Sequence, residues 1–302
     1  MNTDITRFRG LGVAMTTPFQ KDGELDLEGL EKLTVHLINN DADFLVVQGT
    51  TGEAVTMTED EKRLALDKVI EVNGGRLPVV LGFSGNDTNA QVRALKEWNM
   101  KGLDALLVAS PYYNKPDQKG LYHHYQALAK ATETPIILYN VPGRTGSNIL
   151  PDTVIRLAED FEAIIGIKEA SGNMGQVMDL ISRKPEGFPV LSGEDDLTLP
   201  ILGVGGEGVI SVVGNAYPRI FRRMVWAALQ GDLKEAQKEH YALLPIIKGL
   251  FEEGNPCGIK ELLMHIGIGS NTVRPPLVNV SKELSNRLLE LSRKKVLQGD
   301  GS

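Results

Sequence analysis

Cysteine is nearly absent from this chain, since Cys257 is the only one among 302 residues and no disulfide can form within the chain. A secreted scaffold held together by disulfides is therefore excluded, and a reducing compartment is expected. The first thirty residues hold no apolar signal-peptide core. No later apolar run approaches the roughly 20 residues that span a bilayer. These absences predict a cytoplasmic protein with no membrane partner.

Positive charge is also in deficit, with 32 Lys and Arg against 39 Asp and Glu and a formal net charge of -7. The net field repels nucleic acid and anionic lipid surfaces, so neither is expected as a partner. The five histidines form no HxH or HExxH pair, and no acidic cluster has metal-ligand spacing, so no metal site is expected. The remaining composition is that of an ordinary globular enzyme with a small-molecule substrate.

Short apolar runs rich in β-branched residues alternate with segments of helical spacing over roughly the first 215 residues, a rhythm typical of repeated βα units. Strands this apolar cannot face water, so closing the sheet into a (β/α)8 TIM barrel suits them best. An open doubly wound sheet is the alternative fold. The predicted strands are 11–16, 44–48, 78–82, 105–109, 135–139, 164–168, 189–191 and 208–213.

Local signals mark several helix starts. Thr58 and Thr88 each have Glu or Gln three residues later, which is the spacing of a capping box. Pro151 and Pro218 are expected in first helical turns, where the missing N–H is tolerated.

The strand pattern stops near Gly231, after which three helices are predicted. We therefore expect a catalytic barrel domain over 1–231 and a C-terminal helical domain over 232–302. The polar tail from 295 onward has too little apolar surface to pack and is expected to be frayed. The three predicted helices are 233–253, 257–266 and 282–295.

Lys168 closes a predicted strand, at the end of the barrel where active sites lie. Its amine would emerge among aliphatic side chains, where an ammonium is poorly hydrated. A lysine amine that is neutral part of the time can attack a ketone and form an imine, which serves as an electron sink for carbanion chemistry. Tyr139 ends the preceding strand, so its phenol is a candidate proton carrier for that amine. Alternatively, Lys168 reaches solvent or pairs with Glu169, and Tyr139 is a core residue bonded to backbone.

Two further segments offer groups for carboxylates. The turn at 49–53, with sequence GTTGE, combines glycines, two hydroxyls and backbone N–H groups that can hold an anion. A plain turn between a strand and a helix has the same composition. Arg144 lies in a loop between a Pro-Gly turn and another glycine, where its guanidinium can bind a second carboxylate through two nitrogens or simply be solvated.

Five short motifs of this chain, which include the residues discussed above, are together highly specific. By these motifs the chain resembles the dihydrodipicolinate synthase family, within the pyruvate-aldolase superfamily that includes N-acetylneuraminate lyase. The resemblance covers almost the whole chain. It is carried by GTTGE at 49–53, SPYYNKP at 110–116, LYNVPGRTG at 138–146, GIKEASGN at 166–173 and GVISVVGN at 208–215.

The resemblance implies a class I lyase that uses no cofactor other than the imine between its own lysine and pyruvate. Lys168 would form this Schiff base, and Tyr139 would donate and accept protons in a relay through Thr50 and Tyr113. In the family, the tyrosine that matches Tyr113 reaches across a tight dimer interface. A dimer is therefore expected, and commonly a homotetramer.

Substrate binding follows from the same resemblance. Thr51 and the Ile210 backbone would hold the carboxylate of pyruvate, and Arg144 would receive the carboxylate of aspartate semialdehyde. Sialic acid lyases lack this GRTG arrangement. The resemblance therefore implies a condensation of pyruvate with aspartate semialdehyde in the diaminopimelate and lysine pathway.

The chain departs from the family at a regulatory site. Family members inhibited by lysine bind it at the dimer interface, with a glutamate for its amine and, in many, histidines nearby. Asn86 and Tyr112 match that pattern, but Ala90, Glu59 and Lys62 stand at the other positions. Weak or absent inhibition by lysine is expected, because a buried ammonium would lack its anionic partner.

Two alternatives stay open. One is another pyruvate lyase, acting on a sialic acid or a keto-deoxy sugar acid. The other is a catalytically silent barrel that serves as a binding protein.

Overall fold

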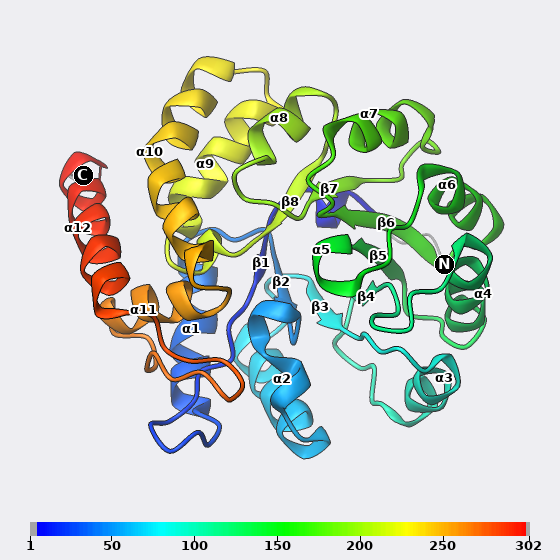
Figure 1. The fold of residues 1–302 in the computed structure, drawn as a ribbon, viewed down its shortest axis with the longest axis horizontal. Helices are drawn as coiled ribbons and strands as arrows, with labels where there is room; N and C mark the ends of the chain where they lie inside the picture. Colours follow the sequence, from blue (N-terminus) through cyan, green and yellow to red (C-terminus); the bar gives the residue numbers. More distant parts are fainter. Residues whose placement is uncertain (1–4, 300–302) are drawn as a thin grey trace.

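The predicted apolar runs form eight parallel strands, and pairing of β8 with β1 closes them into a barrel (Figure 1). The computed structural model describes residues 5–299. The TIM barrel prediction is confirmed, and the open sheet is wrong. The strands are β1 (Gly10–Ala14), β2 (Phe44–Val47), β3 (Val79–Gly82), β4 (Ala105–Ala109), β5 (Ile136–Asn140), β6 (Ile164–Glu169), β7 (Val190–Ser192) and β8 (Gly208–Ser211).

β4 has the predicted bounds, and the other strands differ from the prediction by one or two residues at one or both ends. β5, β6 and β7 each run one residue further than predicted, whereas β8 stops at Ser211. Beyond it the backbone N–H groups of Val212 and Val213 donate to Oδ2 of Asp195, at 3.0 and 2.7 Å. β8 therefore ends early because a buried carboxylate, and not a neighbouring strand, satisfies the next two N–H groups.

The interior of the barrel is filled by side chains from alternate strand positions, among them Phe44, Val80 and Ile137. A short 3-10 helix, η1 (Ile5–Phe8), closes the amino end. The Phe8 ring is fully buried and packs edge-on against Phe44, with ring centroids 5.7 Å apart. Burying each such side chain contributes roughly 1.5–3 kcal/mol. Because the amino end is filled in this way, inward-facing polar side chains gather at the carboxyl end.

One irregularity in β6 decides which way its last residues face. Consecutive residues of β5 pair with Ile164 and then with Gly166, so Ile165 is an extra residue on β6. Ile165 belongs to the cluster of side chains inside the barrel, the inner cluster. Ile167 belongs to the outer cluster, in which strand residues pack against the surrounding helices. Residues two apart in a regular strand share a face, so this bulge shifts the alternation by one position. Lys168 consequently faces the interior of the barrel.

Helices follow the strands and form a ring around them (Figure 1). In this ring lie α1 (Leu27–Asn39), α2 (Glu59–Asn73), α3 (Thr88–Glu97), α4 (Gln118–Ala129), α6 (Pro151–Asp160), α7 (Met174–Arg183), α8 (Thr198–Gly203) and α9 (Pro218–Leu229). The short elements in the connecting loops are η2 (Thr50–Gly52), η3 (Ala54–Thr56), α5 (Pro142–Thr145) and η4 (Val213–Asn215).

Only one of the two expected capping boxes is present. In α2 the Glu61 N–H donates to Oγ1 of Thr58 at 3.2 Å, and the Thr58 N–H donates to Oε2 of Glu61 at 2.8 Å, so this box is confirmed. In α3 the prediction is wrong. Asp87 is the N-cap, its carboxylate accepts from the Ala90 N–H at 3.0 Å, and Thr88 is already helical. A carboxylate one residue earlier provides the stronger, charge-assisted cap.

The C-terminal region consists of α10 (Leu233–Glu252), α11 (Cys257–His265) and α12 (Lys282–Gly299). α10 packs on α9, and α11 and α12 pack on α10, which places this region beside one side of the barrel (Figure 1). Pro151 and Pro218 begin α6 and α9, as predicted. Within residues 5–299, no helix has the length and apolar character to cross a membrane.

The end of the chain differs from the prediction. The last helix was expected to stop at residue 295, but α12 continues to Gly299, so that part of the predicted frayed tail is helical. Residues 300–302 of the predicted tail lie outside the described residues. The predicted domain division at residue 231 falls in the turn between α9 and α10.

Candidate active site

A hollow of about 360 Å³ opens at the carboxyl ends of the strands, where the sequence placed its candidate residues. Its walls come from the ends of several strands, the loops that follow them and two residues of the C-terminal region. The lining residues with reactive or polar side chains are Thr50, Thr51, Tyr139, Arg144, Lys168, Glu194 and Asn255.

Lys168 and Tyr139 lie side by side in this hollow. They are paired neighbours on β6 and β5, and they are only 6% and 7% exposed. Nζ of Lys168 is 4.4 Å from the centroid of the Tyr139 ring. The alternative that Lys168 reaches solvent is wrong, and the Glu169 carboxylate accepts hydrogen bonds from Asn140 and Ser171. The structure thus brings together the amine and the phenol that the sequence singled out.

Gly193, directly after β7, makes room for the Lys168 side chain. A Cβ at this position would lie 3.1 Å from Cε of Lys168 and 2.5 Å from Cβ of Ala170. A larger residue would clash with Ala170 and would also crowd the lysine stem.

Two carboxyl groups near Lys168 have raised pKa values. Burial raises the pKa of Glu194 to about 7, the charge of Asp196 adds to this, and Lys168 opposes it. Burial likewise raises the pKa of Asp195 to about 6. Because Glu194 lines the hollow, it can exchange a proton there near neutral pH. Glu194 was not among the site residues expected from the sequence.

The turn after β2 is the 3-10 helix η2, and its two threonines line the hollow. Oγ1 of Thr51 accepts a hydrogen bond from Nδ2 of Asn255 at 3.0 Å. The carbonyl of Gly52 accepts from Oγ1 of Thr17 at 2.7 Å. Thr51 is buried and Thr50 is exposed. The turn is thus held from two sides and faces the lysine pocket, which is the placement expected of a carboxylate-binding turn.

Arg144 lies on α5, a helix of four residues that Gly146 ends with a positive φ of 71°. It is exposed, yet it lines the hollow with Lys168. A guanidinium at the mouth of a pocket can meet an anionic substrate from solvent.

A sequence model of the dihydrodipicolinate synthetase family matches residues 7–294 of this chain. The chain belongs to the dihydrodipicolinate synthetase family. The predicted resemblance and the prediction of a lyase of the class I aldolase type are therefore confirmed.

Individual relatives agree over nearly the whole chain. The 4-hydroxy-tetrahydrodipicolinate synthase of Flavobacterium psychrophilum is 50% identical over 281 residues, which is 93% of this chain and 96% of the relative. A chloride-inhibited dihydrodipicolinate synthase from Acinetobacter baumannii, solved in complex with pyruvate, matches with a TM-score of 0.92 and 35% identity over 95% of this chain and 99% of its own. A structure described as the first monomeric dihydrodipicolinate synthase variant matches with a TM-score of 0.94 and 39% identity, covering 98% and 99%.

Two site residues predicted from the family stand apart from the hollow. Tyr113 is 89% exposed with a positive φ of 74°, and it does not line the hollow of its own chain. Ile210 is 1% exposed, and its side chain packs in the inner cluster. The prediction for Ile210 concerned its backbone, which pairs with Gly12 of β1.

The residues compared with the family's regulatory site gather in a second hollow of about 600 Å³, which shares part of its lining with the first. Tyr112, Ala90, Glu59 and Lys62 line it. Nζ of Lys62 pairs with Oε1 of Glu59 at 2.7 Å. Asn86 is not part of the lining, but its side chain donates to the Tyr112 carbonyl at 3.2 Å. The hollow thus holds the Lys62 ammonium and the Glu59 carboxylate as a pair, with no charge at position 90.

Two lining residues, Phe251 and Asn255, were missed from the sequence. They come from the end of α10 and the turn before α11, far along the chain from the strand ends. Nothing local distinguishes Asn255 from any other loop asparagine, so only contact with Thr51 reveals it.

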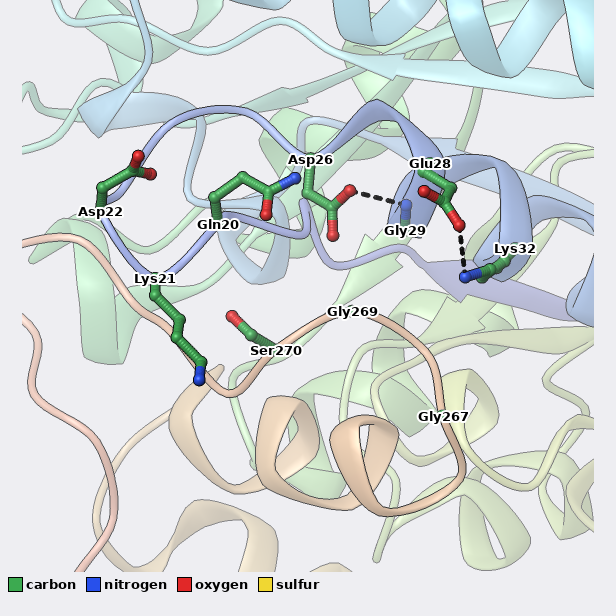
Figure 2. Close-up of a pocket in the computed structure, with 10 residues that line it drawn as sticks. All are labelled: Gln20, Lys21, Asp22, Asp26, Glu28, Gly29, Lys32, Gly267, Gly269 and Ser270. Atoms are coloured by element: carbon green, nitrogen blue, oxygen red, sulfur yellow. Dashed lines mark hydrogen bonds and ion pairs between the residues drawn. The ribbon is translucent and has the colours of Figure 1, made fainter.

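A third hollow, of about 580 Å³, lies between the loop from β1 to α1 and the segment after α11. Figure 2 shows Lys21 and Asp22 on the first segment and Gly267 and Ser270 on the second. Lys21 is exposed, and no tyrosine lines this hollow. It therefore lacks the pairing of a buried amine with a phenol. Within residues 5–299, no group of three or more His, Cys, Asp or Glu side chains is placed to hold a metal ion.

Proposed function

We propose that this chain condenses pyruvate with L-aspartate 4-semialdehyde, the reaction of a 4-hydroxy-tetrahydrodipicolinate synthase in diaminopimelate and lysine biosynthesis. One observation carries the proposal in a chain of this family: the buried amine of Lys168 lies 4.4 Å from the Tyr139 ring, in a hollow that Arg144 also lines. The cytoplasm is the proposed location.

The chemistry begins at Lys168. Its neutral amine attacks the keto carbon of pyruvate, water leaves, and an imine forms between Nζ and that carbon. The imine draws electrons from the neighbouring methyl group, which loses a proton and becomes a nucleophilic enamine carbon. That carbon attacks the aldehyde, the aldehyde oxygen gains a proton, and the adduct is again an imine on Lys168. The amino group of the aldehyde substrate then attacks the imine carbon and displaces Nζ, which closes the ring of the product and frees the lysine amine. We propose that the imine is the only electron sink required, with no metal or organic cofactor.

Proton transfer is proposed for Tyr139, whose ring lies next to the amine. A relay through Thr50 and Tyr113 would connect its phenol to solvent. The exposure of Tyr113 supports the idea that it serves the hollow of a second copy, as in the family's dimer. We propose a tight dimer as the active unit, and a homotetramer built from two dimers.

Thr51 and the Ile210 backbone are proposed to bind the pyruvate carboxylate. Support for Thr51 comes from its place beside Lys168 and from the fixed shape of its turn. Arg144 is proposed to bind the carboxylate of the aldehyde. The barrel over 1–231 and the helical region over 232–302 remain our proposed domains.

Replacing Arg144 by alanine is expected to lower kcat/KM for aspartate semialdehyde about 100-fold, because a charge-assisted contact to a carboxylate contributes about 1.5–3 kcal/mol. Trapping of pyruvate on Lys168 by borohydride should stay unchanged. Steady-state kinetics with aspartate semialdehyde, run beside N-acetylmannosamine as the alternative acceptor, measures the effect.

Arg156→Ala is the matched control, since Arg156 is an exposed arginine on α6 that lies over the Tyr122 ring, 4.0 Å from its centroid. This variant should leave both kcat/KM for aspartate semialdehyde and the trapping of pyruvate unchanged. Faster turnover with N-acetylmannosamine than with aspartate semialdehyde would instead favour a sialic acid lyase.

Millimolar L-lysine is expected to leave the initial rate within about twofold of the uninhibited rate, because the Glu59 carboxylate is already paired with Lys62 and position 90 offers no carboxylate to a bound ammonium. The rate is measured at subsaturating pyruvate with increasing lysine. Ala90→Glu supplies the missing carboxylate and should make the chain more sensitive. Strong suppression of the unaltered protein by millimolar lysine would contradict the expectation.

A further inference from the structure

A fully buried ion pair joins the C-terminal region to the turn that lines the active-site hollow. Glu53 directly follows η2, and Lys260 lies on α11. Their side chains are each only 2% exposed, and Nζ of Lys260 is in direct contact with Oε1 of Glu53. Neither residue lines the hollow itself.

The backbone of Glu53 ends the turn in an unusual conformation. Its φ of 52° and ψ of 31° lie in the left-handed region, which is unfavourable for a residue with a Cβ. Its N–H donates to the Thr50 carbonyl at 3.1 Å, so this conformation closes the Thr50–Gly52 turn. The surrounding structure must hold Glu53 in place for the turn to keep its shape.

The Glu53 carboxylate is held by groups from outside the barrel. Besides the contact with Lys260, its Oε2 accepts from the backbone N–H of Arg274 at 2.9 Å. The same C-terminal region supplies Asn255, which donates to Thr51. Three contacts therefore run from this region to the Thr50–Gly52 turn and to Glu53, the residue that closes it.

Lys260 is itself fixed by contacts that do not involve Glu53. Its Nζ donates to the Thr272 carbonyl at 2.9 Å and lies 4.2 Å from the centroid of the Phe19 ring. Cζ of Arg274 lies at the same distance from that ring. Burial lowers the pKa of Lys260, and the charge of Glu53 opposes this. The ammonium is thus a fixed anchor for the carboxylate.

We propose that Glu53 and Lys260 are positioning residues that hold the Thr50–Gly52 turn in the shape that binds the carboxylate of the keto acid. The inference rests on the proposed function, in which Thr51 binds that carboxylate. The affinity for pyruvate then depends on a residue of the C-terminal region that never touches the substrate.

The test neutralises both partners at once with Glu53→Gln and Lys260→Met, because removing one charge leaves the other buried alone. The amount of borohydride-trapped adduct on Lys168 is measured against pyruvate concentration, together with kcat, the KM for the aldehyde and the thermal midpoint. The half-saturating pyruvate concentration should rise about tenfold, the loss of roughly one hydrogen bond to the carboxylate. The other two kinetic constants should change less than about twofold.

The matched control is Arg223→Met with Glu239→Gln. Arg223 on α9 pairs with the buried carboxylate of Glu239 on α10 at 2.8 Å, and neither residue lines the hollow. This variant should trap pyruvate as the unaltered chain does. If the double variant is unstable, Glu53→Asp alone is used, because it keeps both buried charges but withdraws the carboxylate from Lys260 by one methylene, and the half-saturating pyruvate concentration should again rise.

A folded Glu53 and Lys260 variant with unchanged pyruvate dependence would overturn the proposal. So would an equal loss for both substrates, because a general loss of structure acts on both. These outcomes are distinct from failure of the proposed function, in which the unaltered chain itself traps no pyruvate.

Discussion

Replacing Lys168 by alanine is expected to abolish turnover, with a loss of at least about 10⁴-fold that corresponds to roughly 5 kcal/mol of activation free energy. Without the amine no imine forms, and the methyl group of pyruvate has no electron sink. Mass spectrometry after borohydride reduction with pyruvate should find the adduct on Lys168 of the unaltered chain and none in the variant. The thermal midpoint of the variant is measured alongside to show that it is folded.

Lys184→Ala is the matched control for this experiment. Lys184 is also largely buried, with 16% side-chain exposure, but it pairs with Glu207 at 3.0 Å outside the hollow. Its variant should form the adduct normally. An adduct that persists after loss of Lys168 would place the imine on another lysine. No adduct in the unaltered protein would instead favour a silent barrel.

Replacing Tyr139 by phenylalanine is expected to lower kcat by about 10²–10³-fold, which is the usual range for loss of a positioned acid and base. The ring remains, so packing beside Lys168 should persist and only the phenolic proton is lost. Adduct formation should become slower but still reach completion, because the amine is intact. The rate constants for trapping and for turnover together measure the effect.

Tyr125→Phe is the matched control, because Tyr125 is another buried tyrosine. Its hydroxyl donates to the Val108 carbonyl at 3.1 Å, and burial raises its pKa. This variant should lose some stability and keep its kcat. A Tyr139→Phe variant that turns over within about twofold of the unaltered chain would remove Tyr139 from the mechanism.

Much of the site follows from strand ends, which the sequence marks well. Apolar runs of three to six residues cannot stay in water, so their number and order predict the barrel and its open face. Tyr139 and Lys168 stand at the ends of two such runs, and their meeting follows from neighbouring parallel strands. The substrates were predicted only from the resemblance to the family, because the spacing of apolar residues carries no information about them.

Local rules failed where two similar signals compete. Thr88 and Gln91 have the spacing of a capping box, yet the Asp87 carboxylate caps α3 and displaces the helix start by one residue. Thr88 instead contacts Nδ1 of His124 on the neighbouring helix, at 2.8 Å. Spacing alone does not reveal which of two adjacent acceptors a helix uses.

The sequence by itself determined the barrel, its open face and the residues that end each strand, because burial of apolar runs is a local and strong requirement. Only the tertiary structure decided which way those residues point. In a regular strand, alternation from the inward-facing Ile165 would turn Ile167 inward and Lys168 outward, away from Tyr139, and the bulge at Ile165 reverses this. The contacts from Asn255 and Lys260 to the turn after β2 were likewise hidden, because their partners lie about 200 residues away along the chain and meet only after the barrel has closed.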